Sequence, residues 1–311
     1  MKFISVVTAC YNEEDNIELI YNKVKEIFDN LKSYTYEHIF IDNASTDRTA
    51  LILKDIAGND KKVKIIVNAR NFGHIRSPNY GLQQAKGDAV VSIVADLQDP
   101  PHMIADFIRK WEEGYKIVIG VKTQSEESSI MFKIRKSFYG LINKLSEVEL
   151  IKNFTGFGLY DKQVIDVLRN LNDPYPYFRG IIADIGFEVA RIEYKQPARQ
   201  RGITKNNFYT LYDMAMLGIT NHSKVPLRLA TMLGFSLSII SLLVAFGYAI
   251  YKLIFWKSFS LGIAPVVVGL FFFASVQLFF LGILGEYIGS IHTQVLKRPL
   301  VIEKERINFD D

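Results

Sequence analysis

The stretch from Asp88 to Pro101, DAVVSIVADLQDPP, decides how this chain folds. Its apolar part, residues 89–95, is rich in β-branched side chains and is typical of a strand in the interior of a sheet. Asp96, Gln98 and Asp99 follow at once. The sequence therefore predicts a buried strand that delivers polar side chains to one edge of a sheet.

The polar residues of this stretch predict two different roles. Asp96 and Gln98 would point the same way from an extended chain, and their oxygens suit a hard cation such as Mg²⁺ or Mn²⁺. Such an ion stabilises the charge that develops on a departing diphosphate. Asp99 directly precedes Pro100 and Pro101, which suit the first turn of a helix, so we expect Asp99 to cap that helix.

Further apolar, β-rich segments alternate with helical patterns on both sides of this stretch, at residues 3–10, 36–41, 63–67 and 116–121. The alternation predicts an α/β fold, in which a mostly parallel, Rossmann-like sheet is covered by helices on both faces. No Gly-x-Gly-x-x-Gly follows the first strand and no Walker A loop occurs. Dinucleotide oxidoreductases and P-loop nucleotidases are therefore disfavoured.

Polar clusters follow the predicted strands at residues 11–13, 42–47, 70–71 and 96–99. Ligands of such sheets bind at the carboxyl ends of the strands. One cluster after a strand is usually a helix cap, but several clusters at the same edge indicate a binding site.

The last third of the chain is apolar. Residues 229–251 and 258–285 contain no charged side chain, and each run exceeds the about 20 residues that a membrane-spanning helix needs. We expect two transmembrane helices, with a buried helical hairpin as the alternative. The expected organisation is a cytoplasmic domain at 1–225, a transmembrane hairpin at 226–292 and a cytoplasmic tail at 293–311.

The expected location is the inner (plasma) membrane, with the domain and both termini in the cytoplasm. More basic residues flank the outer ends of the apolar pair than lie in its connecting turn, and no signal peptide is visible. The single cysteine, Cys10, is predicted to be buried and inert. The sequons at Asn43, Asn153 and Asn221 would then be chance matches.

Two basic segments are candidates for contact with anionic groups. Residues 129–147 form a basic amphipathic pattern that suits a membrane surface or, alternatively, packing against the domain. Residues 206–222 lead toward the membrane and are a second juxtamembrane candidate. Between them, residues 199–205 gather cations around a glycine, which indicates either an oxyanion-binding loop or a solvated linker.

Five motifs in order resemble family 2 glycosyltransferases: VVTACYNEEDNI, IDNASTDRT, NARNFGHIRSPNYGL, GDAVVSIVADLQDPP and FRGIIADIGFEVARIEY with RQRGITK. More narrowly, the chain is similar to the dolichyl-phosphate mannosyltransferase and bacterial polyprenyl-phosphate glucosyltransferase group. The resemblance implies a GT-A fold and inverting transfer of a hexose from a nucleotide sugar, with UDP-glucose favoured, to a polyprenyl phosphate. We expect no nucleic-acid partner, and a homo-oligomer is possible.

The resemblance also implies roles for individual residues. The nucleotide would contact Ala9, Tyr11, Glu13, Asp42, Ala95 and Asp96. Asp96 and Gln98 would hold Mg²⁺ or Mn²⁺. The basic loop near the phosphates would supply Arg199, Arg201 and Lys205, and the helix that approaches the lipid phosphate would supply Arg135.

Three positions depart from the family pattern. Val94 stands where a first acid is usual, Gly156 where an acid is common and Gly158 where an arginine is common. A phosphate monoester is already largely anionic at neutral pH, so it needs placement and charge screening rather than a base. The missing acid at Gly156 therefore favours a lipid-phosphate acceptor, whereas Val94 implies either weaker metal affinity or an extra ligand from the diphosphate.

Two alternatives stay open. One is transfer to a saccharide hydroxyl in surface-polysaccharide assembly, with Asp99 or Asp184 as the base. The other is a catalytically degenerate membrane scaffold, which the departures at Val94, Gly156 and Gly158 also allow.

Overall fold

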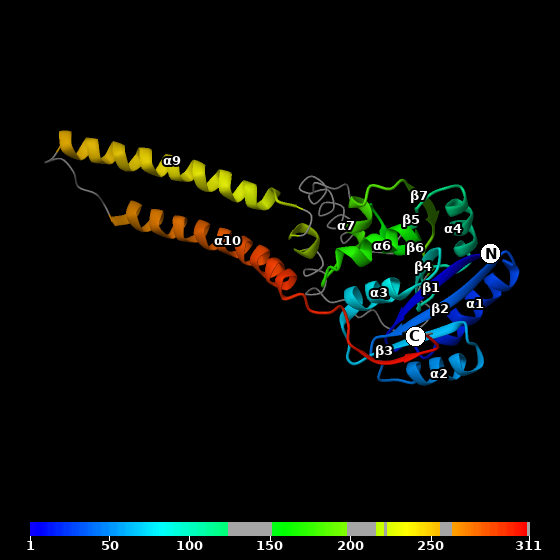
Figure 1. The fold of residues 1–311 in the computed structure, drawn as a ribbon. Helices are drawn as coiled ribbons and strands as arrows, with labels where there is room; N and C mark the ends of the chain where they lie inside the picture. Colours follow the sequence, from blue (N-terminus) through cyan, green and yellow to red (C-terminus); the bar gives the residue numbers. More distant parts are fainter. Residues whose placement is uncertain (124–150, 198–215, 221–222, 256–262, 310–311) are drawn as a thin grey trace.

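The computed structural model describes residues 1–123, 151–197, 216–220, 223–255 and 263–309 (Figure 1). The amphipathic segment 129–147 with Arg135 lies outside these residues, as does the basic loop with Arg199, Arg201 and Lys205. Of the juxtamembrane segment 206–222, residues 216–220 are described and are helical.

An 8-stranded mixed sheet with the order β7-β5-β6-β4-β1-β2-β3-β8 forms the centre of the described domain. Its strands are β1 Lys2–Cys10, β2 Tyr34–Asp42, β3 Val63–Asn68, β4 Ala89–Val94, β5 Ile117–Lys122, β6 Phe154–Asp161, β7 Val189–Tyr194 and β8 Glu303–Ile307. Strands β4, β1, β2 and β3 are neighbours and all parallel, while β6 and β8 run antiparallel to their neighbours. The predicted α/β fold with a parallel centre is confirmed.

Helices cover both faces of the sheet, as predicted. They are α1 Ile17–Asn30, α2 Thr49–Asn59, α3 Gly73–Gln84, α4 Met103–Glu112, α6 Lys162–Leu171 and α7 Phe178–Asp184. Adjacent strand residues alternate between two hydrophobic clusters, because successive side chains of a strand point to opposite faces. Val6, for example, packs in the cluster with α1, α2 and α4, and Val7 packs in the cluster with α3, α6 and α7.

The apolar third forms two long helices, α9 Val225–Ile254 and α10 Ile263–Leu296, which project away from the domain (Figure 1). Within the described residues, the helix segment Gly269–Leu296 is long and apolar enough to cross a membrane, and Val225–Ser241 is a shorter apolar helix. The apolar 18-residue window of this segment has no buried residue, although Tyr287 nearer its end is 8% exposed, so the alternative of a buried hairpin has no support. The second span stays a prediction.

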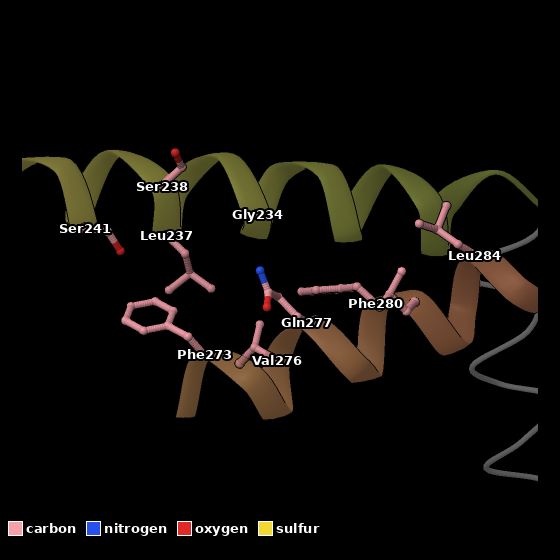
Figure 2. Close-up of a pocket in the computed structure, with 10 residues that line it drawn as sticks. Gly234, Leu237, Ser238, Ser241, Phe273, Val276, Gln277, Phe280 and Leu284 are labelled. Carbon is pink, nitrogen blue, oxygen red and sulfur yellow. The ribbon is translucent and has the colours of Figure 1, made fainter. Parts of the chain in front are cut away.

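A hollow of about 580 Å³ lies between α9 and α10. Figure 2 shows Gln277 of α10 projecting into it toward α9, among apolar neighbours such as Leu237 and Phe273. An amide in such a position is suited to hydrogen bonding between membrane helices.

After α10 the chain returns to the sheet. Strand β8 pairs antiparallel with β3 and covers what would otherwise be an open sheet edge. Leu300 and Val301 are buried against Phe72, which follows β3, and the Ala69 N–H donates to the Ile302 carbonyl at 2.8 Å. Residues 293–311, expected to be a tail, therefore contain a strand of the central sheet.

This return generates a stability prediction. Leu300→Asp or Val301→Asp places a carboxylate in a site that is 8% or 5% exposed, whereas Ile302→Asp places it at a position that is 58% exposed. We expect either buried substitution to cost about 2–4 kcal/mol of unfolding free energy, and the exposed one to cost about 0.5 kcal/mol or less. Thermal unfolding of the full chain in detergent measures the difference, and equal melting temperatures for all three variants would contradict the packing.

Candidate active site at the carboxyl edge of the sheet

The parallel strands bring the predicted site residues to one edge. In the register of the sheet, Ala9 of β1 lies between Ile41 of β2 and Val94 of β4, and Cys10 pairs with Asp42. The strands β1, β2, β3 and β4 all end at this edge, so the loops that follow them are neighbours. This is the edge at which α/β sheets bind ligands.

The loops after β1 and β2 are joined by hydrogen bonds. Asn12 has a left-handed backbone, with φ 55°; its N–H donates to Ser45 Oγ at 2.9 Å and its Oδ1 accepts from the Thr46 N–H at 2.8 Å. The Glu13 N–H donates to Thr49 Oγ1 at 2.9 Å. Tyr11 and Glu13, both predicted to contact the nucleotide, are half-buried in this joined region.

Asp42 is buried at the end of β2, with 1% of its surface exposed. Its carboxylate accepts hydrogen bonds from the backbone N–H and the hydroxyl of Ser45. Burial raises the pKa of Asp42, the hydrogen bonds from Ser45 oppose that rise, and the charge of Asp47 adds to it. Asp42 therefore lies at the carboxyl edge of the sheet and also holds the loop after β2 in shape through Ser45.

Asn43 is a residue that sequence reasoning missed, since it treated this asparagine as a chance sequon. Its Nδ2 donates to Asn71 Oδ1 at 2.9 Å and to the Gly73 carbonyl at 3.2 Å. Its Oδ1 accepts from Asn68 Nδ2 at 3.0 Å and from the Phe72 N–H at 2.9 Å. One buried amide thus connects the loop after β2 to the loop after β3. The signal available in the sequence was the repeated asparagines at strand ends.

Beyond β4 the chain turns at once. Leu97 has φ 59°, and the Gln98 N–H donates to Asp96 Oδ1 at 3.1 Å. Asp96 and Gln98 are half-buried and close together, but the extended geometry predicted for them is wrong, because the chain turns back at Leu97. Ala95, the other predicted nucleotide contact in this stretch, is only 2% exposed.

Asp99 does not cap the next helix, so that prediction is wrong. The capping position of α4 is His102, which makes no side-chain capping bond. Asp99 is instead 4% exposed and accepts a hydrogen bond from Tyr194 Oη at 2.9 Å, so it ties the turn after β4 to the end of β7. Burial raises the pKa of Asp99 to about 6 against the opposing hydrogen bond from Tyr194.

The two departures on β6 have structural reasons. Gly156 has φ +107°, a left-handed backbone that side chains other than glycine rarely adopt. A Cβ on Gly158 would lie 2.4 Å from the Val118 carbonyl oxygen of β5, which leaves no space for it. Neither an acid at 156 nor an arginine at 158 suits this backbone.

The donor set at the edge fits a divalent ion that is shared with phosphates. Among the described residues no group of three or more His, Cys, Asp or Glu side chains could hold a metal ion. Asp96 and Gln98 supply one carboxylate and one amide oxygen, and Mg²⁺ commonly takes one or two protein carboxylates while substrate phosphates and water complete its shell. The residues present therefore fit a metal–diphosphate and not an all-protein metal cage.

Known proteins match this chain over nearly its whole length. Residues 5–168 match the family described as Glycosyl transferase family 2. Glycosyltransferase YkcC of Bacillus subtilis is 34% identical over 99% of this chain and 95% of its own length. The bactoprenol glucosyl transferase of Shigella phage SfII is 35% identical over 97% of each chain, and the prophage bactoprenol glucosyl transferase homolog of Escherichia coli K12 is 32% identical over 97% of this chain and 98% of its own. The expected GT-A type of α/β fold accords with these matches. The chain belongs to glycosyl transferase family 2 and is a glycosyltransferase.

Proposed function

We propose that this protein transfers a hexose from a nucleoside diphosphate sugar to a polyprenyl phosphate at the membrane surface. The observation that carries the proposal is the match, over 97% of each chain, to a bactoprenol glucosyl transferase, which includes the region of the apolar helix α10. A helix long enough to cross a membrane suits a lipid acceptor better than a soluble one.

The donor would bind across the carboxyl edge. Ala9, Tyr11, Glu13 and Asp42 would line the nucleoside, with Ala95 and Asp96 beside it. Asp96 and Gln98 would hold Mg²⁺ or Mn²⁺, and that ion, when bound, would neutralise charge on the departing diphosphate. The hydrogen bonds between Asn12, Asn43 and their neighbours support this assignment, because they hold the loops in place before the donor arrives.

The acceptor chemistry requires no carboxylate base. A phosphate oxyanion would attack the anomeric carbon on the face opposite the leaving group. A new carbon–oxygen bond forms as the bond to the diphosphate breaks, so the configuration inverts and a nucleoside diphosphate leaves. An acid at position 156 would strain the backbone, so none is available there as a base. Asp99 is buried and hydrogen-bonded to Tyr194. Arg135, Arg199, Arg201 and Lys205 stay predicted contacts of the phosphates.

A donor and acceptor screen tests the function. We expect full-length protein in detergent to form a lipid-linked hexose from undecaprenyl phosphate with Mg²⁺ or Mn²⁺, and UDP-glucose to be the best donor. Radiolabelled sugar extracted into the lipid phase measures the product. Folded protein that transfers no sugar from any common nucleotide donor would refute the proposal, and transfer to a saccharide without lipid phosphate would replace it with the hydroxyl-acceptor alternative.

Asp96→Asn tests the metal assignment. Losing the only carboxylate of the pair should lower kcat/KM by at least about 100-fold, because charge stabilisation by a bound metal contributes several kcal/mol. Asp106→Asn on α4 is the matched control, since that side chain is 41% exposed and pairs with Arg109 on the same helix. Activity of Asp96→Asn within a few-fold of the control would show that Asp96 does not hold the metal.

Val94→Asp tests whether the departure at the end of β4 weakens the metal site. Val94 is 43% exposed, so a carboxylate fits there without burial. We expect a second nearby acid to lower the Mg²⁺ or Mn²⁺ concentration for half-maximal activity by about tenfold, as one added charge-assisted ligand is worth about 1.4 kcal/mol or more. Val94→Asn isolates the charge from the change of shape. Identical metal dependence in both variants would mean that position 94 does not face the ion.

A further inference from the structure

A group of positively charged side chains lies where α10 joins the domain. We call Arg70, Arg76, Lys297 and Arg298 the junction cations. Arg70 follows β3, Arg76 lies in α3, and Lys297 and Arg298 come directly after the candidate span Gly269–Leu296. Arg76 donates a hydrogen bond to the Pro299 carbonyl, which brings α3 against the segment that leaves α10.

The side chain of Phe72 gathers two of these cations. The Arg70 guanidinium lies 4.0 Å from the centroid of the Phe72 ring and that of Arg76 lies 5.2 Å from it. Arg76 Nε is buried and has no hydrogen-bond partner within the described part of the chain. Because this nitrogen is closed to solvent, an external anion would bind at the terminal nitrogens of the exposed Arg70 and the half-buried Arg76.

The described carboxylates form no ion pair with the group. Among the described residues, no ion pair includes any of the junction cations. Burial lowers the pKa of Arg76, the positive charges of Arg70 and Arg298 lower it further, and the interaction with Tyr175 opposes this shift. Asp173 lies at the same junction, but its Oδ1 accepts from the Tyr175 N–H and from Gln294 Nε2, both at 2.8 Å. The site therefore keeps an excess of positive charge that an external anion would relieve.

The position of the junction cations at the end of α10 indicates which kind of anion they bind. Residues that directly follow a membrane-spanning helix lie at the level of lipid headgroups, and arginine binds phosphate in a bidentate manner. The acceptor phosphate is a poor candidate. The junction cations lie beside β3, which is three strands from β4, so strand spacing puts them roughly 14 Å from Asp96 at the end of β4. A headgroup of the surrounding bilayer has no such constraint.

We propose that the junction cations bind the phosphodiester headgroup of an anionic phospholipid at a site separate from the acceptor site. The bound headgroup holds the carboxyl edge at the membrane surface, since Phe72 lies under two of the cations and its N–H donates to Asn43 Oδ1. The proposal stands independently of the donor and acceptor assigned above.

Native mass spectrometry of the full chain in detergent, titrated with dioctanoyl phosphatidylglycerol, measures the binding. We expect one tightly bound lipid, an affinity about fivefold lower in Arg298→Gln or Arg76→Gln, and about 25-fold lower in the double variant, as each surface cation contributes about this factor. Lys304→Gln, an exposed cation on β8, is the matched control and should bind as the unchanged protein does. Arg298 is exposed, so Arg298→Gln keeps the test valid if Arg76→Gln unfolds, and Arg76→Lys should restore most of the affinity.

Competing ligands separate the sources of phosphate. Dioctanoyl phosphatidylcholine and inorganic phosphate at the same concentrations should not displace phosphatidylglycerol. Undecaprenyl phosphate should displace it only at concentrations similar to or above those of phosphatidylglycerol. Equal binding in the arginine variants and the unchanged protein would overturn the proposal. So would equal losses in Lys304→Gln, or displacement by undecaprenyl phosphate at concentrations well below those of phosphatidylglycerol. Because no donor is present, a failed transferase assay would leave this result unaffected.

Discussion

The buried amide of Asn43 is the interaction on which the candidate site depends. It uses both donors and both acceptor positions, toward Asn71, Gly73, Asn68 and Phe72, so none of its hydrogen-bonding capacity is left unused. The buried Asn68 Oδ1 has no hydrogen-bond partner within the described residues, and loss of the Asn43 amide would remove four hydrogen bonds from this region. The hydrogen bonds of Asn43 therefore join the loop after β2 to the loop after β3.

The path of the chain ties this edge to the membrane helices. The chain leaves the domain into α9, returns through α10 and ends as β8 on the open edge of β3. Helix α10 is hydrogen-bonded to the start of α9, since Tyr287 Oη donates to the carbonyl of Ser223, just before α9, at 2.6 Å. Lys54 and Glu305, which are 251 residues apart, form an ion pair between α2 and β8. The catalytic domain is therefore completed by residues that follow the apolar helices, and the membrane part is not a detachable anchor.

The chemistry at the edge is consistent with what the backbone permits. Strand β6 carries glycine at positions 156 and 158, and φ at Gly156 and the close approach of β5 at Gly158 both require it. Asp99 is committed to Tyr194 in the interior. A mechanism that needs only an anionic nucleophile, a metal–diphosphate and cations for screening makes no demand on these positions. Asp96 and Gln98 lie close together because the chain turns at Leu97, and not because they alternate along an extended strand.

The amino-acid pattern alone was enough to predict the alternation of strands and helices, the edge at which the polar clusters meet, the family and the apolar helices. These features are encoded locally, in the period of apolar residues and in short ordered motifs, so neighbouring residues suffice to predict them. Three features emerged only from the packed fold: residues after α10 form β8, Asn43 joins two loops, and Asp99 faces Tyr194 rather than a helix end. Each of these depends on groups that lie far apart in the chain, and a short polar side chain can cap, turn or bridge equally well until the packing around it selects its partner.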